Sequence, residues 1–166
     1  LKTREKRVLT HYKSMAETDS FISSPIVSVD SRHIAYTLTT GSGQRLCVID
    51  ADGSHARTVY EDASLSDLEL SEWARDGEEI LAEFDRKDGR HQMVLVSVGS
   101  GSVRVLKTMQ SSSHMRLSPD GRYVAYDAAP AENMATHDIY LLATDGTSDV
   151  PVIQHPADDA FPMWTP

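Results

Sequence analysis

The stretch LSPDGRYVAYDA, residues 117–128, combines a tight turn with a strand. Pro119 presets the backbone angle φ of the second turn position, Asp120 can accept hydrogen bonds from nearby backbone, and Gly121 tolerates a positive φ. The run Tyr-Val-Ala-Tyr at 123–126 is mostly aromatic or β-branched, which favours a strand. A hairpin of this kind builds a whole fold only if it recurs along the chain.

The unit does recur, because residues 27–36 and 73–82 align with it and a fourth copy starts at 164–166. The small residue before the turn falls at positions 28, 74, 118 and 165, which are 46, 44 and 47 residues apart. Apolar runs with the same phase lie at 46–49, 93–96 and 139–142. Each of these runs leads into a turn and a further short run, so every repeat holds four short strands.

A period of about 45 residues with four strands per unit is typical of β-propeller blades. Solenoids of helix pairs share that period, but the apolar runs here are short, β-branched and bounded by Gly, Pro and Asp. The sequence therefore predicts an all-β fold of propeller blades, each with four antiparallel strands. The predicted blades span residues 21–60, 68–106 and 113–153.

The two ends of the chain fit partial blades. Residues 1–12 are predicted to supply the last strand of a preceding blade, with a helix over 2–15 as the alternative, and residues 161–166 to begin a following blade. Three blades cannot close a ring of about 4 to 8 blades, so we expect a segment of a larger propeller, completed by further blades or by self-association. The last runs of the repeats, as at 103–106 and 150–153, do not alternate, which predicts strands covered on both faces.

The charge balance excludes several classes of partner. The 166 residues carry a formal net charge of −9, and the sequence pI is about 5.1. Nucleic acids and anionic membranes both attract basic surfaces, so neither partner is expected, and the short apolar runs exclude membrane insertion as a helix. The single cysteine, Cys47, excludes an internal disulfide and a thiolate zinc site, and its alignment with Val94 and Tyr140 predicts a buried strand position. No cofactor is predicted.

The repeats resemble the TolB-like (PD40, WD40-like) family of bacterial β-propellers. The resemblance rests on SPDG at 118–121 and DIYLLATDG at 138–146, and is weaker upstream, where Val29 and Ser31 replace Pro and Gly. It implies the propeller fold and an extracytoplasmic, periplasmic location. It leaves function open, since similar blades occur in a periplasmic lipoprotein-binding protein, in gating propellers of serine peptidases and in oligogalacturonide lyases.

The predicted topology separates two faces of the disc. Turns between the first and second strands, and between the third and fourth, are tight and rich in Asp and Gly, whereas the other loops and the links between blades are longer. Because binding residues concentrate on variable loops of a rigid scaffold, the longer-loop face is the predicted binding face. Its candidate residues for a ligand or partner are Asp85, Arg86, His91, Glu132, His137, His155, Asp158 and Asp159.

His91 and His137 occupy equivalent positions, 46 residues apart, and both have acidic neighbours. Imidazole and carboxylate are common metal ligands, and the resemblance to the lyases implies a His-lined metal centre as one possibility. No compact spacing such as His-x-x-x-His occurs, and equivalent histidines in repeats more often cap a loop. The sequence therefore predicts no metal site.

Catalytic patterns are also missing from the sequence. No Gly-x-Ser-x-Gly occurs to expose a nucleophile, and Trp73 and Trp164 share one blade position that fits core packing. We therefore expect a non-catalytic propeller that binds a protein or a small carbohydrate or peptide ligand. The alternatives are a metal-assisted oligosaccharide lyase or hydrolase and the gating propeller of a serine peptidase.

Overall fold

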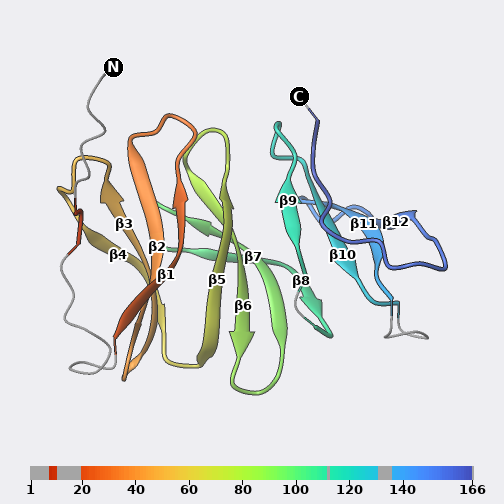
Figure 1. The fold of residues 1–166 in the computed structure, drawn as a ribbon, viewed down its shortest axis with the longest axis horizontal. Coiled ribbons are helices and arrows are strands. Elements are labelled where there is room, and N and C mark those ends of the chain that lie inside the picture. Colours follow the sequence, from red (N-terminus) through yellow and green to blue (C-terminus); the bar gives the residue numbers. More distant parts are fainter. Residues whose placement is uncertain (1–7, 11–19, 112, 131–135, 166) are drawn as a thin grey trace.

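The computed structural model describes residues 8–10, 20–111, 113–130 and 136–165, and it confirms the all-β prediction. The first sheet contains β1 (Phe21–Val27), β2 (His33–Thr40), β3 (Gly43–Asp50) and β4 (Arg57–Asp62). The second contains β5 (Leu65–Trp73), β6 (Glu79–Arg86), β7 (His91–Ser97) and β8 (Val103–Met109). The third contains β9 (Met115–Leu117), β10 (Tyr123–Ala128), β11 (Asp138–Ala143) and β12 (Asp149–Ile153). Each sheet is an antiparallel meander in chain order, so the three sheets are propeller blades, here called blades 1, 2 and 3 (Figure 1).

The repeated turn has the predicted chemistry. In blade 3 the Ser118 hydroxyl donates to Asp120 Oδ1 at 2.6 Å, and the same carboxylate accepts from the Arg122 backbone N–H at 3.1 Å. The Ser118 hydroxyl bond, followed by the backbone bond, lowers the pKa of Asp120. Gly121 has φ 72°, and Ser31, which stands at the equivalent position in blade 1, adopts φ 60° despite its side chain. The turn geometry is therefore imposed by the blade even where glycine is absent.

The two kinds of tight turn meet at one end of each blade. Backbone N–H groups of the second turn donate to carbonyls of the first, as from Thr144 to Arg122 at 2.9 Å and from Val98 to Glu78 at 2.9 Å. Figure 1 shows the β1–β2, β5–β6 and β9–β10 turns at the upper end of the view and the β2–β3 and β6–β7 loops at the lower end. The sheet topology places these turns at one end of each blade and the other loops and the links at the opposite end.

The prediction that the loops at the opposite end are longer is wrong in blades 1 and 2. The β2–β3 loop spans only residues 41–42 and the β4–β5 link only 63–64, whereas the turns of the tight-turn face span residues such as 28–32 and 74–78. The prediction holds for the β10–β11 loop at 129–137, and the name longer-loop face is kept below for that end of the blades.

The blades pack face to face through their central strands. Blade 1 presents Ala35, Leu46 and Val48 to a face of blade 2 that contains Ile80, Ala82, Val94 and Val96. The opposite face of blade 2 presents Leu81, Met93 and Leu95 to a face of blade 3 that contains Val124, Tyr126 and Leu142. Burying apolar area at about 25 cal/mol per Å² makes these faces the main source of stability.

The expectation that the last strand of each blade is covered on both faces is wrong. All five residues of β12 are exposed, and Val105 in β8 is 46 % exposed. The fully covered strands are the central ones, such as β6 and β7, where five successive residues are buried. The last strand lies at the outer edge of its sheet, so it has a hydrogen-bonded neighbour on one side only.

A polar residue at one position of the second strand ties each blade to the segment that follows. Thr37 Oγ1 donates to the Leu68 carbonyl at 2.9 Å, whereas Glu83 Oε2 accepts from the Ser113 backbone N–H at 3.1 Å. Asp127 Oδ2 accepts from the Phe161 backbone N–H at 3.0 Å. Thr37, Glu83 and Asp127 are all buried, so these bonds satisfy polar groups that water cannot reach.

Described residues near both ends of the chain contact the outer blades, as Leu9 does in blade 1 and Phe161 in blade 3. Val8–Thr10 form no strand, although Leu9 packs against the face of blade 1 that includes Tyr36, Cys47 and Ile49, and most of residues 1–12 lie outside the described residues. Residues 161–165 also form no strand. The assignment of both ends to partial blades stays a prediction. The predicted burial of Cys47 is confirmed.

Candidate functional site

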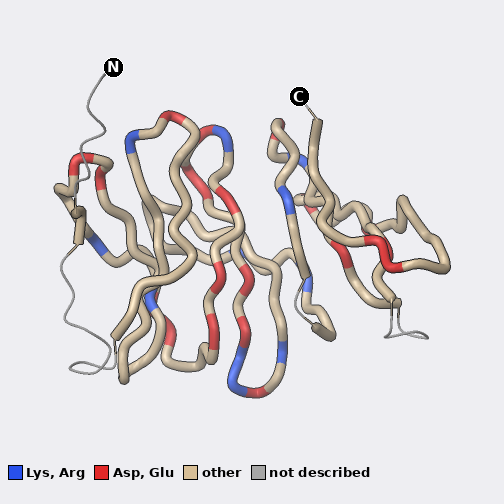
Figure 2. Tube along the Cα trace, viewed as in Figure 1, with Lys and Arg blue, Asp and Glu red and all other residues tan. Residues whose placement is uncertain are grey.

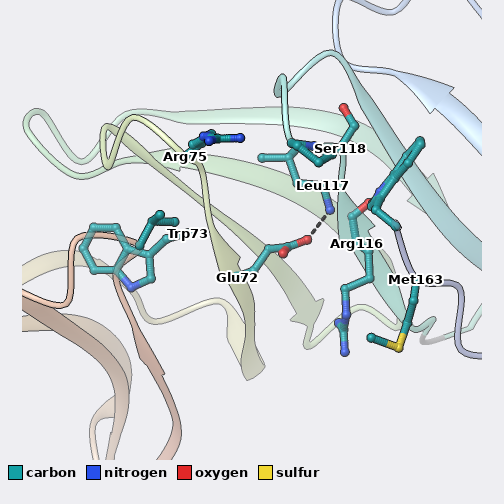
Figure 3. A pocket seen from close by; sticks show the side chains of 10 residues that line it. Glu72, Trp73, Arg75, Arg116, Leu117, Ser118 and Met163 are labelled. Atoms are coloured by element: carbon teal, nitrogen blue, oxygen red, sulfur yellow. Dashed lines mark hydrogen bonds between the residues drawn. The ribbon is translucent and has the colours of Figure 1, made fainter. Parts of the chain in front are cut away.

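A pocket opens where the first strands of blades 2 and 3 approach each other. Its volume is about 390 Å³. Figure 3 shows the carboxylate of Glu72 from β5 in the middle of the view, with the Arg75 side chain above it and the guanidinium of Arg116 from β9 below it. Arg75 lies in the turn after β5, and Met163 lies on the C-terminal segment. The other lining residues are Val29, Trp73, Leu117, Ser118, Pro119 and Trp164. Because Val29, Arg75 and Pro119 belong to turns between first and second strands, the pocket lies at the tight-turn end.

Two guanidinium groups give the pocket its basic character. Arg116 donates to the Met115 carbonyl at 2.8 Å and to Ser71 Oγ at 3.3 Å, and Arg75 is exposed. Neither arginine takes part in an ion pair with another described residue. Guanidinium groups bind carboxylates in a bidentate manner, so each of the two arginines is a candidate contact for a carboxylate ligand.

Glu72 is the acidic member of the pocket. One carboxylate oxygen accepts a hydrogen bond from the Leu117 backbone N–H, which joins blade 2 to blade 3. Burial raises the pKa of Glu72, and the Leu117 hydrogen bond partly opposes that shift. The side chain is therefore committed to an inter-blade contact and is a structural part of the pocket wall.

The two tryptophans make the same contact in two of the repeats. Trp73 Nε1 donates to the Ile26 carbonyl in the first strand of blade 1 at 3.2 Å. Trp164 Nε1 donates to the Arg116 carbonyl in the first strand of blade 3 at 3.0 Å. Trp73 is buried, as predicted, but Trp164 is 36 % exposed, so the prediction of core packing holds fully only for Trp73.

The candidates on the longer-loop face divide into two groups. Asp85, Arg86 and His91 flank the β6–β7 hairpin, where Figure 2 shows acidic and basic residues following one another. Arg86 binds Asp62 Oδ2 at 2.6 Å and Gln92 Oε1 at 2.8 Å, so it ties the hairpin to the link between blades 1 and 2. This guanidinium is only 18 % exposed and is engaged within the fold.

The second group lies around the end of blade 3. His137 Nδ1 is 2.9 Å from Asp158 Oδ1, and the Asp159 backbone N–H donates to the His137 carbonyl at 2.9 Å. His155 is exposed, and its Nδ1 accepts from the Ala157 backbone N–H at 3.1 Å. Glu132 lies outside the described residues. The equivalent residues His91 and His137 thus have different partners and belong to separate clusters.

Sequence reasoning missed the pocket and the buried carboxylate of Glu83. The pocket residues come from three turns, two first strands and the C-terminal segment, and no local spacing joins them. The sequence does indicate where Glu83 lies. It stands two residues before Asp85 on one strand, so the two side chains share a face of the sheet.

Comparison with known proteins supports the fold. No protein-family model matches the sequence, and neither does any curated protein. Among solved structures, TolB from Acinetobacter baumannii is 20 % identical over 96 % of this chain, with a TM-score of 0.67. The fold is that of the TolB-type β-propeller.

Two further structures share the fold. Putative TolB from Agrobacterium tumefaciens is 19 % identical over 82 % of the chain, with a TM-score of 0.68. An oligogalacturonate lyase in complex with manganese is 20 % identical over 82 %, with a TM-score of 0.64. The chain spans 38 %, 47 % and 37 % of the lengths of these three structures. The similarity therefore extends to fewer than half of the residues in each of them. No described helix is long and apolar enough to cross a membrane.

Proposed function

We propose that this TolB-type chain forms part of a non-catalytic, extracytoplasmic propeller that binds a protein or peptide segment. The observation that carries the proposal is the pocket between the first strands, where Arg75 and Arg116 stand beside apolar side chains. Ligand sites combine an apolar lining with a few placed polar groups, and this pocket has that composition. The ligand class that fits is a peptide segment with a carboxylate next to an apolar side chain.

The pocket is suited to binding rather than to nucleophilic chemistry. The Ser118 hydroxyl donates to Asp120 Oδ1 at 2.6 Å and accepts from the Tyr123 backbone N–H at 3.0 Å, so it is committed to the turn. No histidine lines the pocket among the described residues, so Ser118 has no imidazole base beside it.

A peptide-binding experiment tests the proposal. The probes are three sets of fluorescent hexapeptides, acidic–apolar, neutral–apolar and basic–apolar, and the readout is fluorescence anisotropy at two ionic strengths. We expect the acidic–apolar set to bind the full chain. Arg75→Ala and Arg116→Ala each weaken binding about tenfold, because each removes one charge-assisted contact.

The control is Arg122→Ala, which removes a charge from the tight-turn end outside the pocket. It should leave binding within about twofold. Equal binding of all three peptide sets, or equal effects of the three substitutions, would overturn the proposal. Turnover of an oligogalacturonide by the full chain would favour the lyase alternative instead.

A further inference from the structure

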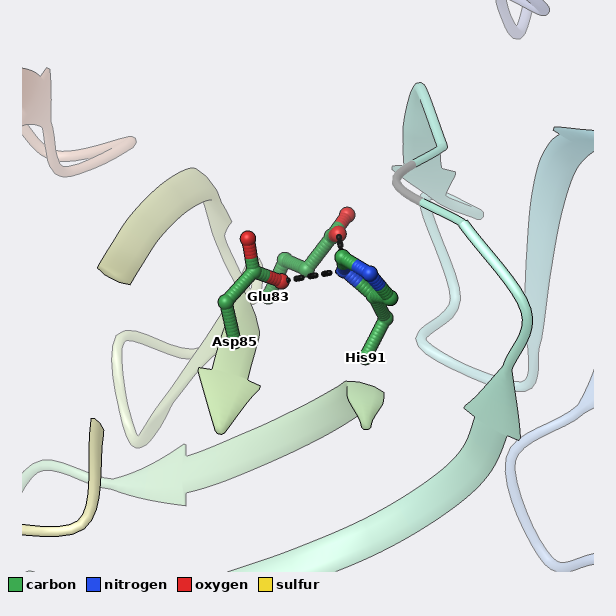
Figure 4. Close-up of side chains that lie close together, drawn as sticks. All are labelled: Glu83, Asp85 and His91. Atoms are coloured by element: carbon green, nitrogen blue, oxygen red, sulfur yellow. Dashed lines mark hydrogen bonds and ion pairs between the residues drawn. The ribbon is translucent and has the colours of Figure 1, made fainter. Parts of the chain in front are cut away.

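An imidazole and two carboxylates converge at the longer-loop end of blade 2 (Figure 4). Glu83 and Asp85 are two residues apart on β6 and share one face, and Asp85 is paired in register with His91 of β7. His91 Nδ1 lies 2.6 Å from Asp85 Oδ1 and 3.6 Å from Glu83 Oε1. One potential ligand atom from each residue lies within 4.8 Å of the other two.

The rest of the fold holds the three side chains in place. The Glu83 side chain is 6 % exposed, and its other oxygen, Oε2, accepts from the Ser113 backbone N–H of the link to blade 3. Asp85 and His91 side chains are 25 % and 26 % exposed, so the cluster is open on one side. A cavity of about 260 Å³ between blades 2 and 3, lined by Glu83, Glu69 and His114 among others, adjoins the buried carboxylate.

A proton on His91 Nδ1 cannot form hydrogen bonds of equal length with both carboxylates. It can point along the 2.6 Å contact to Asp85, whereas Glu83 Oε1 at 3.6 Å is beyond hydrogen-bond distance. A metal ion that replaces this proton contacts all three groups at once. Ligand bonds of about 2.1 Å in a tetrahedral site place neighbouring ligand atoms about 3.4 Å apart, which needs only small side-chain movements here.

We propose that Glu83, Asp85 and His91 form a binding site for a divalent first-row transition-metal ion such as Zn²⁺. One imidazole and two carboxylates supply three ligands of the types that such ions prefer, and the exposed side leaves positions for water. The site is separate from the peptide pocket at the opposite end of the blades and does not depend on the proposed function.

Comparison among the blades makes blade 2 distinct. The positions of Glu83, Asp85 and His91 correspond in blade 1 to Thr37, Thr39 and Gln44, which offer no imidazole or carboxylate. In blade 3 they correspond to Asp127, Ala129 and His137, so that blade has one carboxylate fewer at these positions. Arg86, which follows Asp85 in the sequence, projects from the other face of β6 and is held by Asp62 and Gln92.

Zinc titration of the full chain tests the site. Metal-free protein is titrated with Zn²⁺ by isothermal calorimetry at pH 7.5, and bound zinc is counted after equilibrium dialysis. We expect His91→Ala and Asp85→Asn each to bind one Zn²⁺ fewer than the wild type, or to bind it at least about tenfold more weakly. Asp85→Asn keeps the side-chain volume at a partly exposed position, and circular dichroism checks that both variants are folded.

The matched control is His137→Ala, because His137 occupies the equivalent position in blade 3 and pairs with Asp158 alone among described carboxylates. It should bind zinc as the wild type does. Zinc binding at other places, for example at His55 beside Asp50, would be the same in the wild type and in all three variants. Equal stoichiometry and affinity in wild type, His91→Ala and Asp85→Asn would overturn the proposal, as would an equal loss in His137→Ala.

Discussion

Trp164 donates its indole N–H to the carbonyl of Arg116 at 3.0 Å, one blade behind it in the chain. Trp73 repeats this bond to Ile26 at 3.2 Å, and the two donors and the two acceptors stand at matching positions of the repeat. The repeated contact places residue 164 where a following blade would begin. It supports the prediction that residues 161–166 belong to such a blade.

Removal of the buried indole N–H tests this contact. Trp73→Phe keeps an aromatic ring but leaves the Ile26 carbonyl without that donor. We expect it to lower the free energy of unfolding by about 1–2 kcal/mol, measured by urea denaturation. Trp164→Phe, at a half-exposed position, should cost less than about 1 kcal/mol. A larger loss from Trp164→Phe than from Trp73→Phe would contradict the buried role of Trp73.

Gly101 tests the packing of blade 2 on blade 1. Its φ is 71°, and a Cβ placed there would overlap the carbonyl oxygen of Val59 in β4. We expect Gly101→Ala to destabilise the fold by about 3 kcal/mol, because the strain of a positive φ adds to a clash with backbone. The control is Gly77→Ala, with φ 77° and open space around it, which should cost about 1 kcal/mol. Equal losses in urea denaturation would show that the two blades do not meet at Val59.

Arg86 is predicted to be a structural cross-link rather than a ligand contact. Arg86→Gln removes the ion pair with Asp62 and should lower the free energy of unfolding by about 1–3 kcal/mol. Arg90→Gln removes the exposed pair with Asp88 at the tip of the same hairpin and should change stability by less than about 0.5 kcal/mol. The free energy of unfolding of both variants is measured by chemical denaturation. Equal and small losses in the two variants would contradict the structural role of Arg86.

Glu72 is predicted to make stability depend on pH. Burial raises the pKa of Glu72 in the folded state. Its contribution to the free energy of unfolding is therefore fully present when the carboxyl is protonated, and it is lost as the pH rises through the folded-state pKa. Glu72→Gln stays neutral and can still accept from the Leu117 N–H. The variant should match the wild type near pH 4 and have the higher melting temperature at pH 7. Glu78→Gln, an exposed change nearby, gives the background, and a wild type that is more stable than Glu72→Gln at pH 7 would refute the burial argument.

The architecture could be predicted because its determinants are local. Turn residues such as Asp120 and Gly121 and the apolar runs recur at a fixed period, and each needs only its sequence neighbours to be recognised. The outer strands were mispredicted because an apolar run in sequence does not reveal which edge of a sheet it occupies. Val152, for example, belongs to such a run and is 53 % exposed.

The candidate sites were only partly predictable, because they depend on contacts between blades. Asp85 and His91 flank one hairpin, so both could be named in advance. Glu83 joins them through burial and a hydrogen bond from the Ser113 backbone N–H, and Arg75 and Arg116 line one pocket only after two blades pack. The two-residue spacing from Asp85 indicates the face on which Glu83 lies but not its burial, and no spacing in the sequence links Arg75 to Arg116.

The packing of successive blades along their first strands is the central claim, and the two indole N–H protons test it most directly. The chain contains two tryptophans, so its nitrogen-resolved NMR spectrum holds two indole signals that substitution to Phe assigns. We predict nuclear Overhauser effects from the Trp73 indole proton to Ile26 and Val27, and from the Trp164 indole proton to Arg116 and Leu117. Indole protons that show contacts only within their own repeat would contradict the packing and, with it, the pocket between the blades.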